Sequence, residues 1–319
     1  MTPRVTVAIP AYNGARFLRE AITSILGQTW RELTVTCIDD ASADDSAAVA
    51  DSMGVRVVRN PSRIGLAANW NRALDLCETE FLVIAHQDDV YAPQFIERMI
   101  ATLDRHPRAF AAHCKSTAID EDGREIEDPA ALFKERFWPR GEKEVETELT
   151  TLRRGNYVIA PAVMLRMPAA GRFNEAYEFV TDWDYWLRGL LDGKTMIGLN
   201  ERLVSFRRHA ATATLASERS MRRYEEELQL LRELDARVPA KNPYRALENN
   251  LLTGFARRLA EGDRDGANTL LRFGAERVPS FSNSARAHLM RGTLPFGKAG
   301  GASLRLAERL FLRLYNRRR

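Results

Sequence analysis

The chain has 319 residues, enough for one large domain or two modest ones with a substantial apolar core. Hydrophobic residues make up 45% and charged residues 28%, and no apolar run approaches the roughly 18 residues that a membrane span needs. The start of the chain lacks a secretory signal, the three cysteines lack metal-ligand spacing, and the net charge of +4 comes without a nucleic-acid-binding signature. We therefore expect a cytoplasmic protein with no nucleic-acid partner.

Strand and helix patterns alternate over the first 115 residues or so. Apolar runs predict strands at 5–9, 33–38, 55–58 and 81–85, with helices between them at 15–26, 44–53 and 65–76. This alternation predicts an α/β fold with a mostly parallel sheet flanked by helices. Since the carboxyl ends of parallel strands share one sheet edge, we expect the polar residues after each strand to converge there.

The remaining chain is predicted in less detail. The acidic stretch 116–150 is expected to form a turn and then a mobile loop, followed by a strand at 160–165 and a helix at 182–192. Residues 218–319 have helical patterns broken at Pro239, Pro243, Pro279 and Pro295, with a glycine-rich hinge at 297–301. We expect two domains, a sheet domain at 1–217 and a helical region at 218–319 that serves packing, oligomerisation or association with a membrane surface.

Two adjacent carboxylates, Asp88 and Asp89, follow the apolar strand 81–85. Side-by-side anions repel, so the pair is costly unless a cation or hydrogen-bond donors balance it. At the carboxyl end of a buried strand, this points to a divalent metal with a phosphate-bearing ligand. The alternative is that one of them caps the helix that begins near Pro93.

Eight short motifs occur in an order that resembles the family 2 glycosyltransferases, which have the GT-A fold, a Rossmann-like mixed and mostly parallel sheet. The resemblance covers about residues 3–215 and rests on VTVAIPAYN (5–13), SILGQT (24–29), IDDAS (38–42), GLAANWN (65–71), QDDVY (87–91), RFNE (172–175), TDWDYWLR (181–188) and FRRH (206–209). It implies inverting transfer of a sugar from a nucleotide-diphosphate donor, with UDP favoured and GDP or dTDP open. The acceptor would be a hydroxyl of a saccharide or lipid-linked saccharide, in assembly of a surface polysaccharide or glycolipid.

By this resemblance, the nucleotide would lie along Pro10, Ala11, Tyr12 and Asn13, with Asp40 on the base and Asp39 supporting the turn. Asp88 would bind the ribose and Asn71 would contact the nucleotide, and Gly65 and Gln87 belong to neighbouring motifs at the same site. Asp89 and His209 would hold Mn²⁺ or Mg²⁺, which suits hard oxygen ligands. Arg207 would either pair with diphosphate oxygens or lie at the surface.

Two positions depart from the family pattern, which often has an acidic residue where this chain has His86 and commonly has Glu where this chain has Thr181. At His86, the loss of a carboxylate leaves fewer anionic ligands, so a lower metal affinity is expected. The alternative is that His86 packs beneath the site as an ordinary strand-end residue.

Inversion needs a carboxylate that takes the proton from the acceptor hydroxyl. Asp182 and Asp184 compete for this role, and being two apart on a helix they point about 200° away from each other. The family pattern selects Asp182, which would otherwise cap the helix, and Asp184 is expected to pair with Arg188. Trp183 is a candidate for stacking on a sugar, although dense aromatic residues more often pack a helix against a sheet.

The last seventeen residues, 303–319, carry six arginines against one glutamate. Leu304, Ala307, Phe311 and Leu314 follow helical spacing, so this helix is predicted either to contact the anionic inner face of a membrane or to pack on its own domain or a second subunit. For the whole chain, the rival to a transferase is a catalytically silent nucleotide-sugar-binding or scaffold protein of the same fold. A nicotinamide-dependent oxidoreductase would need a Gly-x-Gly-x-x-Gly turn, which is absent after the first strand.

Overall fold

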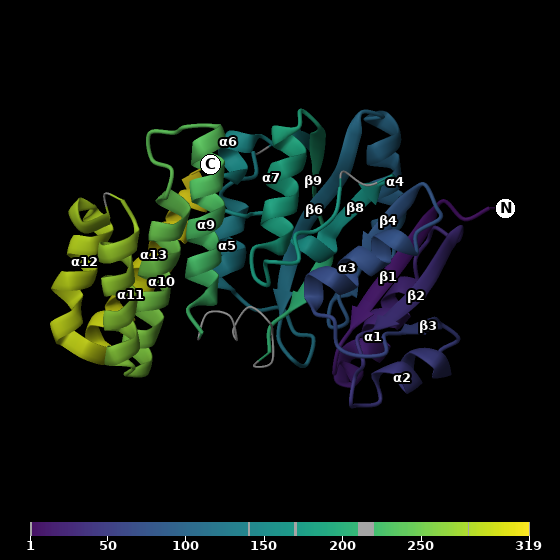
Figure 1. The fold of residues 1–319 in the computed structure, drawn as a ribbon, viewed down its shortest axis with the longest axis horizontal. Helices are drawn as coiled ribbons and strands as arrows, with labels where there is room; N and C mark the ends of the chain where they lie inside the picture. The colour runs from purple at the N-terminus through teal and green to yellow at the C-terminus, as the bar shows by residue number, and fades with distance from the viewer. Residues whose placement is uncertain (1, 140, 169–170, 210–219, 280, 319) are drawn as a thin grey trace. The chain divides into compact units, whose positions relative to one another are not determined.

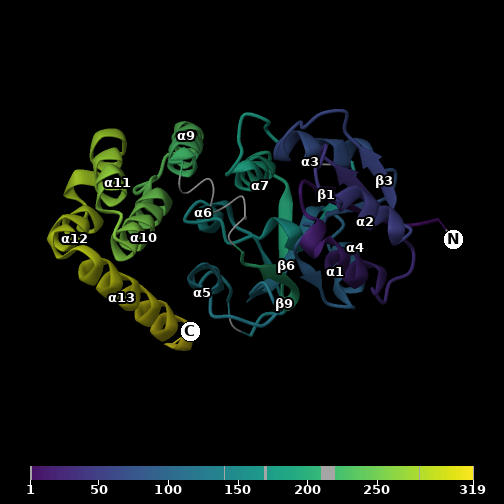
Figure 2. The same ribbon diagram turned by 90° about the horizontal axis from the view of Figure 1, so that it is seen from below.

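The computed structural model describes residues 2–139, 141–168, 171–209, 220–279 and 281–318, with side chains described as far as residue 310 in the last helix. The chain forms two compact units. Unit 1 comprises Met1–Leu152 with Asn156–Ala210, and unit 2 comprises Arg153–Gly155 with Ala211–Arg319. Figures 1 and 2 show the elements of each unit.

Unit 1 is built on a mixed sheet whose described strands run in the order β3-β2-β1-β4-β8-β6-β9-β5, with β7 paired to β9. The pairs β3-β2, β2-β1, β1-β4 and β6-β9 are parallel, as the alternating pattern predicted for the first strands. The strands are β1 Val5–Ala11, β2 Leu33–Asp39, β3 Arg56–Arg59, β4 Phe81–Ile84, β5 Val90–Tyr91, β6 Ala109–Ile119, β7 Glu144–Glu146, β8 Val163–Arg166 and β9 Thr195–Arg207.

The helices of unit 1 cover both faces of this sheet, and Figure 2 shows α1, α2 and α4 on one side with α3 and α7 on the other. Alternate β1 residues Val5, Val7 and Ile9 enter a core shared with buried side chains of α1 and α4, because successive strand side chains point to opposite faces. The helices are α1 Ala15–Leu26, α2 Ser46–Ser52, α3 Leu66–Asp75, α4 Phe95–Arg105, α5 Pro129–Glu135, α6 Leu149–Leu152 and α7 Thr181–Leu191, with a 3-10 turn η1 at Ala160–Ala162.

The acidic stretch 116–150, predicted as a turn and then a mobile loop, does contain the turn after Asp120, but regular elements occupy much of the rest of its described part, so the loop prediction was wrong. Strand β6 continues to Ile119, and α5, β7 and α6 follow it. Asp128 begins α5 by accepting a hydrogen bond from the backbone N–H of Ala131 at 2.9 Å, with Pro129 in the first turn, a common helix start. Strand β7 pairs antiparallel with β9. This insertion therefore forms part of the wall of unit 1.

Unit 2 is helical, and α10 contacts each of the other long helices. The helices are α9 Arg222–Arg237, α10 Arg245–Glu261, α11 Arg264–Arg277, α12 Ala285–Thr293 and α13 Gly297–Arg318, with 3-10 turns η2 Phe281–Asn283 and η3 Leu294–Phe296. The predicted hinge at 297–301 is wrong, because α13 runs through it. A Cβ on Gly301 would lie 2.3 Å from the backbone nitrogen of Ala260, so glycine here lets two helices approach closely.

The last helix does not present the predicted apolar stripe as one face. Leu304 is buried, whereas Ala307 is exposed, and the side chains of Phe311 and Leu314 lie outside the described residues. The exposed apolar side chains are instead Leu306, 60% exposed, and Leu310, 48% exposed. Among the described residues, no helix combines the length and the apolar character needed to cross a membrane.

Candidate functional site

The polar residues that follow β1, β2 and β4 meet at one sheet edge, as predicted. Ala11 pairs with Asp39, and Ala8 pairs with Ile84, which aligns the three strand ends. The Gln87 amide then brackets Tyr12, because its Oε1 accepts from Tyr12 N at 2.9 Å and its Nε2 donates to Tyr12 O at 3.2 Å.

The turn after β1 leaves two side chains on the surface of this edge. Tyr12 is 38% exposed, with the Arg63 guanidinium 4.3 Å from the centroid of its ring. Asn13 has φ 49°, and its Oδ1 accepts from Ala43 N at 2.9 Å. A Cβ on Gly14 would lie 2.0 Å from Gln87 Oε1, so a side chain there would displace the Gln87 amide from Tyr12. Pro10 and Ala11 belong to β1 itself, and Ala11 is buried.

The two aspartates at the end of β2 hold the neighbouring loops. Asp39 accepts from Ser42 N at 3.3 Å and pairs with Arg59 Nε at 3.2 Å, so it supports the turn as predicted. The Asp40 carboxylate is 3% exposed and accepts from Asn60 Nδ2, Ile64 N and Gly65 N at 2.8–2.9 Å. Gly65 has φ 91°, a conformation that favours glycine. Asp40 therefore fixes the loop from Asn60 to Gly65 beside the site.

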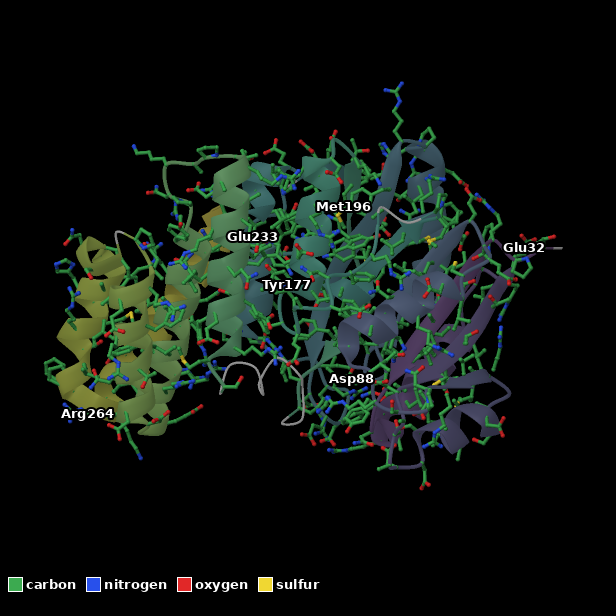
Figure 3. All side chains as sticks on the ribbon, in the orientation of Figure 1. Glu32, Asp88, Tyr177, Met196, Glu233 and Arg264 are labelled. Carbon is green, nitrogen blue, oxygen red and sulfur yellow. The ribbon has the colours of Figure 1, made fainter. Side chains whose placement is uncertain are left out.

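His86, Asp88 and Asp89 form a cluster just beyond β4, with one potential ligand atom from each lying within 4.8 Å of the others. Asp88, labelled in Figure 3, accepts at Oδ2 from His209 Nε2 at 2.8 Å. Asp89 is buried and accepts at Oδ1 from Arg207 N at 2.9 Å, while its Oδ2 lies 3.7 Å from His86 Nδ1. One oxygen of each carboxylate is thus held by β9 and the residues directly after it.

The environment gives these adjacent acids opposite pKa shifts. Burial and the charge of Asp88 raise the pKa of Asp89 well above its ordinary value. Burial alone would also raise the pKa of Asp88, but the hydrogen bond from His209 and the charge of His86 outweigh it and leave that pKa lowered. Two neighbouring carboxyls that repel each other behave this way, and a bound cation would relieve the repulsion.

Arg207 is not a surface arginine, so that alternative was wrong. It is 3% exposed, and its guanidinium donates to the carbonyls of Asp88 at 2.9 Å, Asp120 at 3.0 Å and Glu121 at 3.1 Å and to the Glu20 carboxylate at 2.6 Å. With its own N–H on Asp89, Arg207 ties both aspartates to β9 and α1.

Asn71 was expected to contact the nucleotide, and in the structure its side chain is buried and hydrogen-bonded within the protein. The side chain is 1% exposed; its Nδ2 donates to Phe173 O and Glu175 Oε1 at 3.0 and 2.8 Å, and its Oδ1 accepts from Phe173 N at 2.8 Å. Asn71 therefore clamps α3 to the segment before α7.

Asp182 lies in the first turn of α7, where Val180 is the N-cap residue, so Asp182 does not cap the helix. Its Oδ2 accepts from Asn156 Nδ2 at 3.0 Å and its Oδ1 from Trp183 N at 2.7 Å. Asp184 pairs with Arg188 at 2.8 Å, as predicted. Burial raises the pKa of Asp182, and the nearby charge of Lys134 opposes this. A carboxylate with a raised pKa is a stronger proton acceptor.

Aromatic side chains connect the β4 end to α7. Trp70 lies 5.6 Å from the His86 ring and 5.1 Å from Phe173, which stacks on Tyr185 at 4.3 Å. Trp183 is 3% exposed and donates to Leu152 O at 3.0 Å. It therefore packs the helix and offers no open face for a sugar.

Several residues at this site were missed by sequence analysis. Asn156 and Lys134 neighbour Asp182, Ser42 accepts from Asn13 N at 3.0 Å, and Glu20 pairs with Arg207. Each is distant in sequence from its partner, and no local pattern marks such a contact. Only the acidic character of Glu20 on the exposed side of an amphipathic helix could have suggested an ion pair.

Comparisons with known proteins fit this architecture. The model of glycosyl transferase family 2 matches residues 6–167, about half of the chain. The chain is 25% identical over 229 residues to an uncharacterized glycosyltransferase of Rickettsia prowazekii, covering 70% of each protein. It is 28% identical over 104 residues to the glycosyltransferase GlyG of Streptococcus pneumoniae, covering 31% of this chain and 35% of GlyG.

Solved structures share the fold at low sequence identity. Residues 1–349 of Staphylococcus aureus TarS, in complex with UDP-GlcNAc, give a TM-score of 0.61 at 16% identity, covering 95% of this chain and 89% of that one. The mannosyltransferase PcManGT of Pyrobaculum calidifontis, in complex with GDP-Man and Mn²⁺, gives 0.59 at 18% identity, covering 99% and 85%. The chain belongs to glycosyl transferase family 2, whose activity is glycosyl transfer from nucleotide sugars.

Proposed function

We propose that the chain is an inverting, metal-dependent glycosyltransferase that moves a hexosyl group from a UDP-sugar to an acceptor hydroxyl. The observation that carries this proposal is the cluster of His86, Asp88 and Asp89 at the same sheet edge as Tyr12, Asn13 and Asp40. Carboxyl ends of strands in open α/β sheets are where such ligands bind. The acceptor belongs to surface polysaccharide or glycolipid assembly.

The donor would lie along the turn after β1. Tyr12 offers an exposed ring, and the backbone around it is held by Gln87 and Ser42. Asp40 Oδ1 already accepts two hydrogen bonds, whereas Oδ2 accepts one. Oδ2 can therefore accept another hydrogen bond, from an N–H of the nucleotide base. Asp88 would accept from the ribose.

The residues present suit a divalent cation. Arg207 N donates to one oxygen of Asp89, and His209 Nε2 donates to one oxygen of Asp88. The other Asp89 oxygen lies beside His86 Nδ1. Two carboxylates and an imidazole suit Mn²⁺, and Mg²⁺ would use mainly the oxygens. Asp88, Asp89 and His86 would hold the ion. His209, which we expected from the sequence to be a ligand itself, would instead fix Asp88, because its Nε2 already donates to Asp88 Oδ2. When bound, the ion would neutralise the leaving diphosphate.

Asp182 would act as the general base. It would take the acceptor hydroxyl proton as that oxygen bonds to the anomeric carbon, and the bond from that carbon to the diphosphate oxygen breaks on the opposite face. Its carboxylate is held at both oxygens by Asn156 and Trp183, which would keep it aimed during proton transfer.

A thermal-shift panel of UDP, GDP, dTDP and CDP, each with and without Mn²⁺, tests the donor and metal together. We expect UDP with Mn²⁺ to raise the melting temperature, because a ligand that binds only the folded state stabilises it. The metal-dependent part should disappear in Asp89→Ala. If no nucleotide stabilises the protein with or without Mn²⁺, the proposal fails and a scaffold role gains support.

We further propose a cytoplasmic location with peripheral contact at the inner face of the membrane through residues 303–319. Exposed Leu306 and Leu310 lie four residues apart on α13, beside Arg305 and Arg309, a combination that suits an anionic lipid surface. Co-sedimentation with phosphatidylglycerol vesicles, compared with neutral vesicles, measures this contact. A homodimer remains a prediction for which light scattering is the measurement.

A further inference from the structure

The ordered insertion between β6 and β8 reaches the Asp182 carboxylate through two residues. Lys134, near the end of α5, donates from Nζ to the carbonyl oxygens of Asn156 at 2.8 Å and Val158 at 3.1 Å. Asn156 then donates from Nδ2 to Asp182 Oδ2 at 3.0 Å. A cation thus fixes the backbone that carries the amide, and the amide contacts the carboxylate.

The amide orientation follows from chemistry. An ionised carboxylate only accepts hydrogen bonds, so the Asn156 nitrogen has to face Asp182. Because Trp183 N occupies the other oxygen at 2.7 Å, both oxygens are fixed and the plane of the carboxylate is set. The Trp183 indole donates to Leu152 O, so α7 is tied to the same insertion a second time. Asn156 Oδ1 is buried and has no hydrogen-bond partner among the described residues.

The charge and the hydrogen bond nearest to Asp182 both lower its pKa, against the effect of burial. Burial raises the pKa of Asp182, and Lys134 is the largest charge that lowers it, with the hydrogen bond from Asn156 acting in the same sense. On its own helix, Asp184 is paired with Arg188. An opposite charge stabilises the ionised carboxyl, which is the form able to accept a proton.

We propose that Asn156 and Lys134 are positioning residues for Asp182: Asn156 orients the carboxylate, and Lys134 anchors Asn156 while supplying the positive charge that keeps the carboxylate ionised. This rests on the proposed function, in which Asp182 is the general base. It assigns the insertion a role in catalysis, although neither residue need touch the reacting atoms.

The test measures Asp182 directly in the full chain, without a substrate. Carbon-13 NMR of protein labelled at the aspartate carboxyl carbon follows each titration, and the Asp182 signal is the one lost in Asp182→Asn. The variants are Lys134→Met and Asn156→Ala. Lys115→Met is the matched control, because Lys115 holds Glu135 of the same helix at 2.7 Å. Circular dichroism confirms that each variant folds.

We expect Lys134→Met to move the Asp182 midpoint up by about one pH unit. Asn156→Ala should move it in the same direction, and Lys115→Met should leave it unchanged. A second readout is the rate of UDP release from UDP-glucose, with water as acceptor and Mn²⁺ present. The acidic limb of its pH–rate profile should move by the same amount as the Asp182 midpoint. In this assay, Asn156→Ala should also lower kcat about tenfold or more with little change in KM.

Unchanged midpoints in both variants, or an equal shift in Lys115→Met, would overturn the proposal. If one variant does not fold, the other decides by the same criterion. Failure of the proposed function has a different signature, because Asp182→Asn would then release UDP as fast as the unaltered chain, whatever the titrations show.

Discussion

The two halves of the candidate site are built in different ways. The half that contains Asp88 and Asp89 is held by β9 and the residues after it, with Arg207 N on one carboxylate, His209 Nε2 on the other, and three carbonyls bound by the Arg207 guanidinium. The half that contains Asp182 is held by side chains of an insertion, through Asn156 and Lys134. A metal site needs ligands in fixed positions, whereas a general base also needs a suitable pKa. The half with Asp182 therefore depends more on its electrostatic surroundings.

This contrast predicts that the largest single loss of turnover lies in the Asp182 half. Asp182→Asn keeps the shape and the hydrogen bond to Trp183 N but removes the proton acceptor. We expect kcat for glycosyl transfer to fall about 10³-fold, within the usual range for a general base. Donor affinity, measured by calorimetry with the nucleotide identified in the thermal-shift panel, should be unchanged.

The matched control is Asp184→Asn, on the same helix but paired with Arg188. It should retain most of the turnover and lose some stability. If Asp184→Asn is the inactive variant, the assignment of the base is wrong.

Sequence analysis succeeded for the half of the site with Asp88 and Asp89 and largely failed for the surroundings of Asp182. Asp88 and Asp89 are contiguous with an apolar strand, so their place at the sheet edge could be predicted from local pattern. The surroundings of Asp182 could not, because Lys134 and Asn156 are remote from it in sequence. The stretch that carries Lys134 is acidic and was expected to be mobile. The Asp128 cap followed by Pro129 was a local helix signal that the sequence analysis passed over, whereas the pairing of β7 depends on β9, which is far along the chain.

Arg207 shows a further limit of sequence analysis. An arginine at the end of a strand is ordinarily exposed, and only the carbonyls of Asp88, Asp120 and Glu121 make its burial favourable. Those carbonyls come from two separate loops, one with Asp88 and one with Asp120 and Glu121, so their convergence is a property of the fold. The order of β8, β6 and β9 in the sheet was likewise unpredicted, since antiparallel insertion of β8 depends on contacts far along the chain.

The second prediction compares adjacent arginines. Arg207→Met removes four hydrogen bonds from a buried group and leaves three carbonyls without this donor, so we expect the free energy of unfolding to fall by about 3 kcal/mol. Arg208→Met removes a more exposed pair with Asp128 and should cost about 1 kcal/mol. Urea unfolding measures both. Equal losses would show that the Arg207 network does not hold the aspartates more firmly than a surface ion pair does.

The smallest expected effect concerns the choice of metal. His86 supplies the nitrogen of the cluster, 3.7 Å from Asp89 Oδ2, and nitrogen ligands favour transition ions over Mg²⁺. His86→Asp gives an all-oxygen set, so the preference for Mn²⁺ over Mg²⁺ should fall about tenfold, by analogy with the loss of other metal-site groups. Mn²⁺ binding with UDP present, followed by electron paramagnetic resonance with Mg²⁺ as competitor, measures the ratio. His288→Asp, at an exposed position on α12, is the control. An unchanged ratio in His86→Asp would mean that His86 packs under the site without reaching the ion, and the oxygens of Asp88 and Asp89 would then set the metal preference alone.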